Sequence, residues 1–338
     1  MMRLTSLHIN NSGHSIQRGD LVSPPDGRLV YDILCNHIIF NYTEIAPYFP
    51  ADTVYVGIVR EPFSQFISSF IYEAAFSTYL RSITRANPVN PIEKFLFSSF
   101  DHHYIHMQPH EVMFNNRMSV DFGFPLGNFW ADKSNTSIVD AFIKDVDGRF
   151  NLVMITELFD ESLILLRRLL GWKTEEIIYL KSNVFTATSK SPSWMSRSSS
   201  RTDYPEYFKR AFETYASLDV ALYKHFYQKL KDTIASQPPE FQAEVADFKD
   251  LQRNVSDLCK RDVSLSLPHL FKQTNHTSEF TLNQEKCDDM KREERFIFSR
   301  AFGYMKKKFY SNFGRSVPKI EKRRRKYRNI YLLRKGPG

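Results

Sequence analysis

The stretch "VYVGIVREPFSQFISSFIYEAAF", residues 54–76, changes from the pattern of a strand to that of a helix within a few residues. Its first part, residues 54–59, is short, apolar and rich in β-branched side chains, which predicts a strand buried on both faces. Pro62 cannot continue a strand ladder, but it fits the first turn of a helix, where a missing N–H costs nothing. The apolar residues beyond it recur at helical spacing and predict a helix over 62–80.

Arg60 lies where this strand gives way to the helix, beside helix N–H groups that the sequence leaves without partners. In an open α/β sheet, anionic ligands bind at this position, outside the carboxyl ends of the strands. The alternative is a surface arginine that only caps the turn. The stretch by itself leaves both interpretations open.

The composition indicates a folded chain with a basic end. Of its 338 residues, 42% are apolar and 14% aromatic, which is enough for a large core and excludes a disordered protein. The formal charge of +8 is uneven, because residues 306–338 carry +12 and the rest of the chain −4. Such a tail would suit nucleic acid or anionic lipid, but the sequence has no zinc spacing, RNA-recognition signature or basic DNA-reading helix. We interpret it as a solvated extension and predict no nucleic-acid partner.

Signals for the cellular compartment are mixed. No apolar run approaches 18 residues, and no signal-peptide pattern follows Met1. Five Asn-x-Ser/Thr sequons would nevertheless suit a lumenal protein, and they begin at Asn10, Asn41, Asn135, Asn254 and Asn275. The cysteines form no Cys-x-x-Cys pair, so the sequence predicts no metal site; they are Cys35, Cys259 and Cys287.

Further strand patterns alternate with helices along the chain. Residues 149–157 predict a second buried strand. Residues 28–40 predict a strand that ends near Cys35 and is followed by a short helix, and residues 175–181 predict a short β-like segment. Alternation of strands and helices over 30–230 predicts an α/β fold, with a parallel sheet flanked by helices.

Two further helices have recognisable ends. Residues 159–172 predict a helix with Asp160 as its N-cap and Gly171 as its stop. Asp203 opens a long helix, with Glu206 placed as in a capping box. The apolar stripe of this long helix consists of Phe208, Phe212, Tyr215, Leu218, Leu222, Phe226 and Leu230.

Several of these stretches, in this order, resemble the galactose 3-O-sulfotransferase family, whose members include galactosylceramide sulfotransferases. The segments that carry the resemblance are "DILCNHIIFN" (32–41), "GIVREPFSQFISSF" (57–70), "NNRMSVDFGF" (115–124), "RFNLVMITELFDESLILLRRLLGW" (149–172) and "IIYLKSN" (177–183). The resemblance implies a P-loop-NTPase-like sulfotransferase domain over residues 30–305. An irregular segment, 1–29, would precede this domain, and the basic tail, 306–338, would follow it.

The resemblance also implies a reaction and a site. Members of the family move a sulfuryl group from PAPS (3′-phosphoadenosine 5′-phosphosulfate) to the 3-hydroxyl of a galactose on a glycolipid or glycoprotein. Arg60 and Ser68 match the residues that bind the 3′-phosphate, through a guanidinium fork and a hydroxyl. Ser64, one helical turn earlier, is a secondary candidate. The alternative for Ser68 is a hydroxyl bonded to its own helix, at the carbonyl four residues earlier.

Transfer to a sugar hydroxyl also needs a base, and the departing phosphate needs cationic stabilisation. His37, in "CNH", is the candidate base or acceptor contact. The alternative is a core histidine beside an apolar strand.

The resemblance further places the two C-terminal cysteines, Cys259 and Cys287, in a disulfide and leaves Cys35 unpaired. A lumenal compartment would permit this bridge. The alternative is three free thiols in a cytosolic protein.

The chain departs from the family at its N-terminal end. Family members carry a signal anchor, a first strand and a phosphate-binding loop upstream of the CNH segment, and nothing in residues 1–30 resembles them. We therefore expect an N-terminally incomplete chain of a Golgi enzyme whose lumenal domain is tethered by an anchor that this chain lacks. Two other hypotheses stay open. One is a catalytically impaired paralogue or fragment that binds nucleotide or glycan, and the other is a nucleic-acid or membrane binder that acts through its tail.

Overall fold

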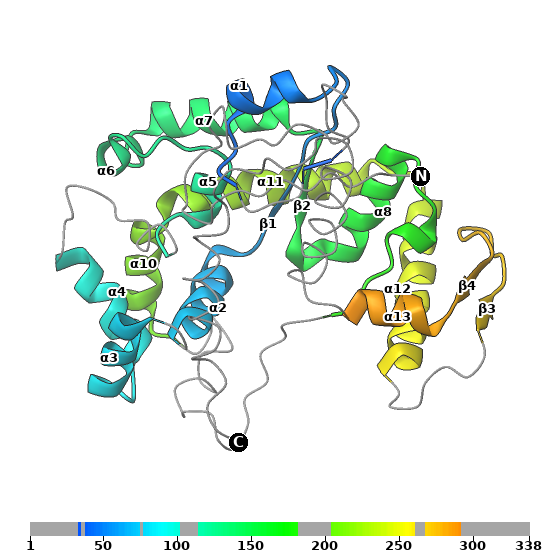
Figure 1. Cartoon of the computed structure of the whole chain (residues 1–338). Helices are drawn as coiled ribbons and strands as arrows, with labels where there is room; N and C mark the ends of the chain where they lie inside the picture. Colours follow the sequence, from blue (N-terminus) through cyan, green and yellow to red (C-terminus); the bar gives the residue numbers. More distant parts are fainter. Residues whose placement is uncertain are drawn as a thin grey trace, which may run out of the picture.

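The computed structural model shows a mixed α/β fold, mostly helical around a small parallel sheet (Figure 1). It describes residues 33–34, 38–74, 77–101, 114–181, 204–260 and 268–291. Strand β1 (Val56–Val59) pairs in parallel with β2 (Leu152–Ile155), in the register that sets Val56 beside Leu152. The two predicted strands and their parallel pairing are therefore confirmed, whereas most of the strand expected from residue 28 to near Cys35 lies outside the described residues.

The remaining elements surround this pair of strands. The helices are α1 (Tyr42–Ile45), α2 (Pro62–Ala74), α3 (Thr78–Ala86), α4 (Pro91–Asp101), α5 (Arg117–Asp121), α6 (Phe129–Asp132), α7 (Thr136–Arg149), α8 (Phe159–Leu170), α10 (Glu206–Tyr215), α11 (Ser217–Ala235), α12 (Glu240–Lys260) and α13 (Gln284–Lys291). Short 3-10 helices are η1 (Ala46–Tyr48), η2 (Thr156–Leu158) and η3 (Thr174–Glu176). Strands β3 (His269–Phe271) and β4 (Phe280–Leu282) form an antiparallel hairpin.

One face of the sheet is covered by α5, α7 and α11. Val59, Val153 and Ile155 are buried there against a set of apolar side chains that includes Met118, Ile143, Val146, Leu222, Phe226 and Leu230. These partners recur at helical spacing on their helices, as expected for an apolar face that packs on a sheet. The stripe predicted from Phe208 to Leu230 is buried throughout and is confirmed.

The opposite face is only partly covered. Met154 of β2 packs there with α8 and α12, through a cluster that includes Ile164, Phe241 and Phe248. On β1, the residues of this face are Val56 and Ile58, which remain 37% and 49% exposed. Strands of a parallel sheet are usually buried on both faces. Among the described residues, this face is therefore closed over β2 and open over β1. The prediction of a strand buried on both faces is wrong for β1.

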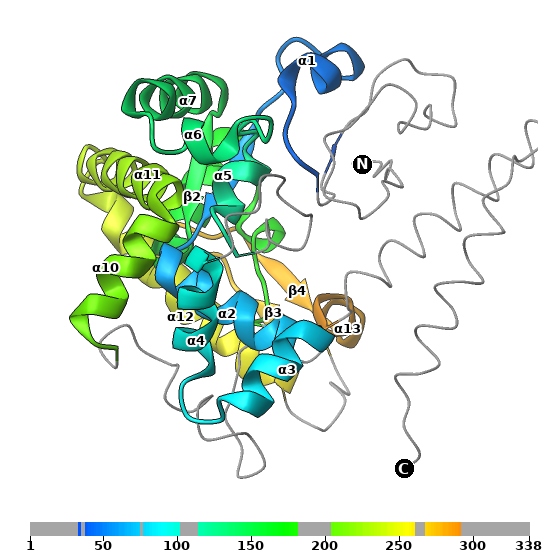
Figure 2. The ribbon, with the colours of Figure 1, turned by 90° about the vertical axis from the view of Figure 1, so that its left-hand side faces the viewer.

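Four helices gather beyond the carboxyl end of β1 (Figures 1 and 2). α2 follows directly from this end and packs with α3, α4 and α10. Their contact is largely aromatic, with rings of Phe63, Phe66 and Phe70 set at an angle to those of Phe95 and Phe212. Angled ring pairs suit the electrostatics of aromatic side chains and add to their burial energy. This aromatic cluster fixes α2, and with it the start of the helix beside Arg60.

Two predicted helices are divided in the structure. The helix predicted over 62–80 ends at Ala74, and α3 begins anew with Ser77 as an N-cap that accepts the N–H of Leu80. The long helix predicted from Asp203 is two helices, which meet at Ala216. Asp203 itself lies outside the described residues. The apolar spacing continues across the second division, which is why the sequence pattern did not reveal it.

Two local predictions near α8 were wrong. The N-cap residue of α8 is Leu158 and not Asp160. Asp160 lies within the first turn, where its carboxylate accepts a hydrogen bond from the hydroxyl of Tyr179. The segment 175–181 forms no strand, since the backbone N–H and C=O of Tyr179 pair with the side-chain amide of Gln252 instead. The stop at Gly171 is confirmed, with φ of +65°.

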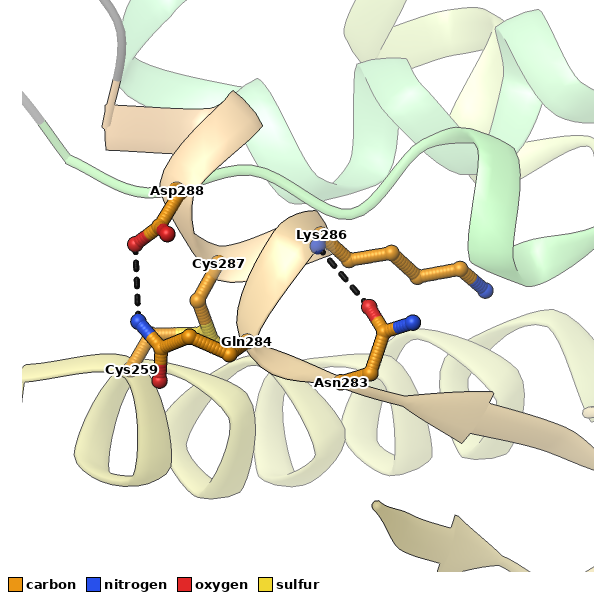
Figure 3. Close-up of a disulfide and its surroundings, with 6 residues drawn as sticks. All are labelled: Cys259, Asn283, Gln284, Lys286, Cys287 and Asp288. Carbon is orange, nitrogen blue, oxygen red and sulfur yellow. Dashed lines mark hydrogen bonds between the residues drawn. A yellow bond between two sulfur atoms is a disulfide. The ribbon is translucent and has the colours of Figure 1, made fainter. Parts of the chain in front are cut away.

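A disulfide joins Cys259, near the end of α12, to Cys287 in α13 (Figure 3). Their Cα atoms lie 5.3 Å apart, and both residues are buried in the cluster around α8 and α12. At the start of α13, Asn283 accepts the backbone N–H of Lys286, which anchors the helix that carries the second cysteine. The pairing expected from the family resemblance is present, and Cys35 lies outside the described residues.

Gly57 of β1 is a position where only glycine fits. A Cβ atom there would lie about 2.5 Å from ring atoms of Phe122, which is itself buried against Phe150. We expect Gly57→Ala to lower the free energy of unfolding by roughly 1–3 kcal/mol, because the ring must move within a packed core. Denaturant unfolding measures this loss. Gly148→Ala is the control, since a Cβ there meets nothing within 4 Å; equal stability of both variants would contradict the packing argument.

Candidate functional site

Arg60 follows the last residue of β1 and lies at the carboxyl end of the sheet. Its backbone N–H leaves the strand ladder and donates to the sulfur of Met118, 3.3 Å away on α5. The side chain is half-buried, and its guanidinium makes no hydrogen bond or ion pair with the described residues. A partly buried charge without a partner is unfavourable. The position therefore suits an anionic ligand.

The N-terminus of α2, beside Arg60, is already capped. The Glu61 carboxylate accepts the backbone N–H of Phe63 at 3.1 Å and that of Ser64 at 2.7 Å. The expectation of unpaired helix N–H groups at this point was therefore wrong, because an acidic side chain at a helix start fills the same role as a bound anion. An anion at this site would be bound by side chains, and Arg60 is a cation there without an ion pair to the described residues.

A second carboxylate holds the turn from the other strand. Glu157, in η2 directly after β2, accepts the backbone N–H of Glu61 at 3.0 Å and the hydroxyl of Tyr223 at 3.3 Å. Burial, and then the nearby Glu157 carboxylate, raise the pKa of Tyr223, so its hydroxyl stays a donor. Thr156 adds a bond from its hydroxyl to the carbonyl of Val59. The chain around Arg60 is thus fixed on both sides.

The two serine candidates differ in their surroundings. Ser64 is engaged, since its hydroxyl donates to the Glu61 carboxylate at 2.8 Å. Ser68 is exposed on the next turn of α2, and its hydroxyl makes no hydrogen bond with the described residues, including the carbonyl four residues earlier. Six residues separate Pro62 from Ser68, about 9 Å along the helix axis. The structure places Arg60 and Ser68 on adjoining elements and records no contact between them.

His37 lies outside the described residues, but the chain just after it is well anchored. The N–H of Phe40 donates to the carbonyl of Asp121 at 2.8 Å. Gly123 has φ of +96°, and a Cβ there would collide with the carbonyl oxygen of Phe40. The ring of Phe40 packs on Phe150, which lies two residues before β2.

The segment 115–124 connects two of the motifs found in the sequence. At its start, the sulfur of Met118 contacts the backbone of Arg60. At its end, Asp121 and Gly123 contact the chain that follows the CNH segment. Sequence spacing could not reveal this arrangement, because the contacting residues lie 58 positions apart in the first case.

The fold and this edge define a class of protein. It is an α/β protein in which an arginine follows a parallel strand and precedes a helix, at the carboxyl edge where open α/β sheets bind their ligands. The sequence model of the galactose-3-O-sulfotransferase family matches residues 19–283. The chain belongs to the galactose-3-O-sulfotransferase family.

Curated relatives agree with this assignment. Mouse galactose-3-O-sulfotransferase 2 is 32% identical over 236 residues, 69% of this chain and 54% of the relative. Mouse galactose-3-O-sulfotransferase 3 is 34% identical over 57% of this chain and 41% of the relative, and mouse galactosylceramide sulfotransferase 29% identical over 68% and 50%. The chain thus spans about half the length of the curated relatives that it matches. No solved structure matches it significantly.

Proposed function

We propose that this chain is the nucleotide-binding part of a PAPS-dependent galactose 3-O-sulfotransferase. In this proposal the Arg60 guanidinium and the Ser68 hydroxyl bind the 3′-phosphate of PAPS. The observation that supports it is the half-buried guanidinium of Arg60, which has no partner among the described residues although two carboxylates are fixed in the same turn. The planar guanidinium offers a fork of donors that can bind two oxygens of a phosphate at once.

The reaction proposed is a displacement at sulfur. The galactose 3-oxygen forms a bond to sulfur, the bond from sulfur to the 5′-phosphate oxygen breaks, and adenosine 3′,5′-bisphosphate leaves. The proton of the hydroxyl passes to a base, for which His37 is our candidate. In its motif this residue lies three positions before Phe40, the residue that the Asp121–Gly123 turn anchors.

The acceptor proposed is a terminal galactose on a glycolipid or a glycoprotein glycan. The names of the relatives contain galactose or galactosylceramide, which supports galactose as the sugar that accepts the sulfate. They do not distinguish a lipid from a protein as the molecule that carries this sugar. The test is transfer of labelled sulfate from PAPS by the longest protein that the gene encodes. We expect transfer to a β-galactoside, and none to the same galactoside methylated at its 3-oxygen. Equal labelling of both compounds, or of neither, would contradict the proposal.

We also propose that the enzyme works on the lumenal side of the Golgi membrane, tethered by an anchor. No helix among the described residues is long and apolar enough to cross a bilayer. A lumenal location makes the sequons available for N-glycosylation. Asn275 is the best placed of them, exposed in the turn between β3 and β4 and without a hydrogen bond to the described residues.

We expect Asn275 to carry an N-linked glycan in protein that has passed through the secretory pathway of the cells that express it. Asn135 instead caps α7, and Asn254 lies inside α12. Asn275→Gln should remove the mass of one glycan, while Asn254→Gln, the control, should not. Mass spectrometry after peptide N-glycosidase treatment reads each site directly. A tryptic peptide in which Asn275 is never modified would contradict the expectation.

A further inference from the structure

A buried carboxylate on α11 lies behind the Arg60 turn. Asp219 is 4% exposed, and its Oδ1 accepts the backbone N–H of Ser119 at 2.7 Å and the hydroxyl of Ser119 at 2.6 Å. Its Oδ2 accepts the backbone N–H of Met118 at 3.2 Å. These donors come from the first turn of α5, a helix whose own N-cap residue provides no side-chain cap. Asp219 therefore caps α5 from another helix.

The cap is itself held in place. Asn116 accepts the N–H of Asp219 at 2.8 Å and donates to the carbonyl of Tyr215 at 3.2 Å. It does so with φ of +55°, a strained conformation for a residue other than glycine. The buried ammonium of Lys133 donates to the same carbonyl at 2.9 Å. Four polar side chains thus fix the junction of α10 and α11 against α5: those of Asp219, Ser119, Asn116 and Lys133.

The last link connects this network to the proposed site. The sulfur of Met118 accepts the backbone N–H of Arg60. The position of α5 therefore determines where the chain leaves β1 at Arg60. We propose that Asp219 is a positioning residue for Arg60, acting through the first turn of α5 and Met118, an inference that rests on the proposed role of Arg60. Its role is to fix the backbone position from which the Arg60 side chain extends.

The charged groups that face Asp219 are few among the described residues. Lys133 is a cation on which Asp219 acts electrostatically. Arg117 shares with Asp219 the lining of a cavity of about 10 Å³, and the Asp121 carboxylate repels that of Asp219. Burial raises the pKa of Asp219 to about 6, although the bonds from Ser119 and Met118 oppose this. Burial lowers the pKa of Lys133 to about 8. Below about pH 6, Asp219 therefore gains a proton and loses acceptor capacity for its three donors.

Hydrogen exchange at single amides tests the link without any ligand. In Asp219→Asn we expect the amides of Ser119 and Arg60 to exchange about tenfold faster. Ser119 loses a charge-assisted bond, and Arg60 donates to Met118, whose own N–H loses the same carboxylate. Asp232→Asn is the matched control, since Asp232 is exposed on the same helix and its carboxylate accepts, from the described residues, a single bond from Gln228. Faster exchange at Ser119 with unchanged exchange at Arg60 would overturn the proposal.

A second variant covers the case in which Asp219→Asn does not fold. Met118→Leu keeps the volume of the side chain but removes the sulfur acceptor. We expect faster exchange at Arg60 and unchanged exchange at Ser119. Unchanged exchange at Arg60 in this variant would overturn the proposal by itself.

A ligand measurement separates this inference from the proposed function. We compare how much the affinity for adenosine 3′,5′-bisphosphate falls between pH 7 and pH 5 in the parent and in Asp219→Asn. The loss should be about three- to tenfold larger in the parent, because only the parent gains a proton on the buried carboxylate. The phosphate also gains a proton near pH 6 in both proteins, and the comparison removes this effect. A parent that binds no nucleotide would contradict the proposed function, while the exchange results would still decide the role of Asp219. Parallel pH profiles would count against that role.

Discussion

Arg60→Ala is expected to weaken binding of adenosine 3′,5′-bisphosphate about ten- to a hundredfold. A charge-assisted bond between guanidinium and phosphate contributes roughly 1.5–3 kcal/mol, and this variant removes it. The Glu61 cap should survive the change, because it is formed by the backbone of Phe63 and Ser64 and not by the arginine. Isothermal titration calorimetry measures the loss, and the free energy of unfolding should change little.

Two further variants sharpen this result. Arg60→Lys keeps the charge but loses the fork, so its affinity should lie between those of the parent and the alanine variant. Arg253→Ala is the control, because Arg253 is exposed on α12 and, among the described residues, pairs with Asp250 on the same helix and no other. Undiminished affinity in Arg60→Ala would show that the phosphate binds elsewhere.

Replacing both bridged cysteines, as Cys259→Ala with Cys287→Ala, should lower the free energy of unfolding by roughly 3–4 kcal/mol. The cysteines lie 28 residues apart, and a bridge that closes a loop of this length restricts the unfolded chain by about that amount. The loop carries the β3–β4 hairpin, whose Phe280 and Leu282 pack in the cluster around α12. Denaturant unfolding without reductant measures the difference.

The parent protein in reductant provides the control for this variant. If the bridge acts through the unfolded chain, the reduced parent and the double variant should have similar stability. A loss under about 1 kcal/mol in the double variant would contradict a structural bridge.

The transition from β1 to α2 could be predicted because the residues that cause it are adjacent in the sequence. A β-branched run predicts a strand, and Pro62 after it predicts the end of that strand and the start of a helix. The Glu61 cap was missed, although an acidic residue just before a proline at a helix start was a usable signal. Recognising it would have corrected the expectation of free N–H groups beside Arg60.

Contacts between distant segments could not be predicted in this way. Asp219 and Ser119 are 100 positions apart, and Gln252 and Tyr179 are 73 apart. A side-chain amide that pairs with the backbone of Tyr179 turns a β-like pattern into an irregular segment. Sequence periodicity reports which face is apolar, and it carries no information about which polar side chain completes a backbone bond.

The family resemblance contributed what periodicity could not. It selected Arg60 and Ser68 among many polar residues, and it paired Cys259 with Cys287, which the structure shows. His37 stays a prediction, since it lies outside the described residues.

The most direct test of the central claim compares two nucleotides that differ only in the 3′-phosphate. Calorimetry with adenosine 3′,5′-bisphosphate and with adenosine 5′-phosphate gives the contribution of that group to binding. We predict that the parent prefers the bisphosphate by at least about tenfold and that Arg60→Ala loses most of this preference, since the arginine is its main partner. Equal affinity of the parent for both nucleotides, or an undiminished preference in Arg60→Ala, would contradict the account.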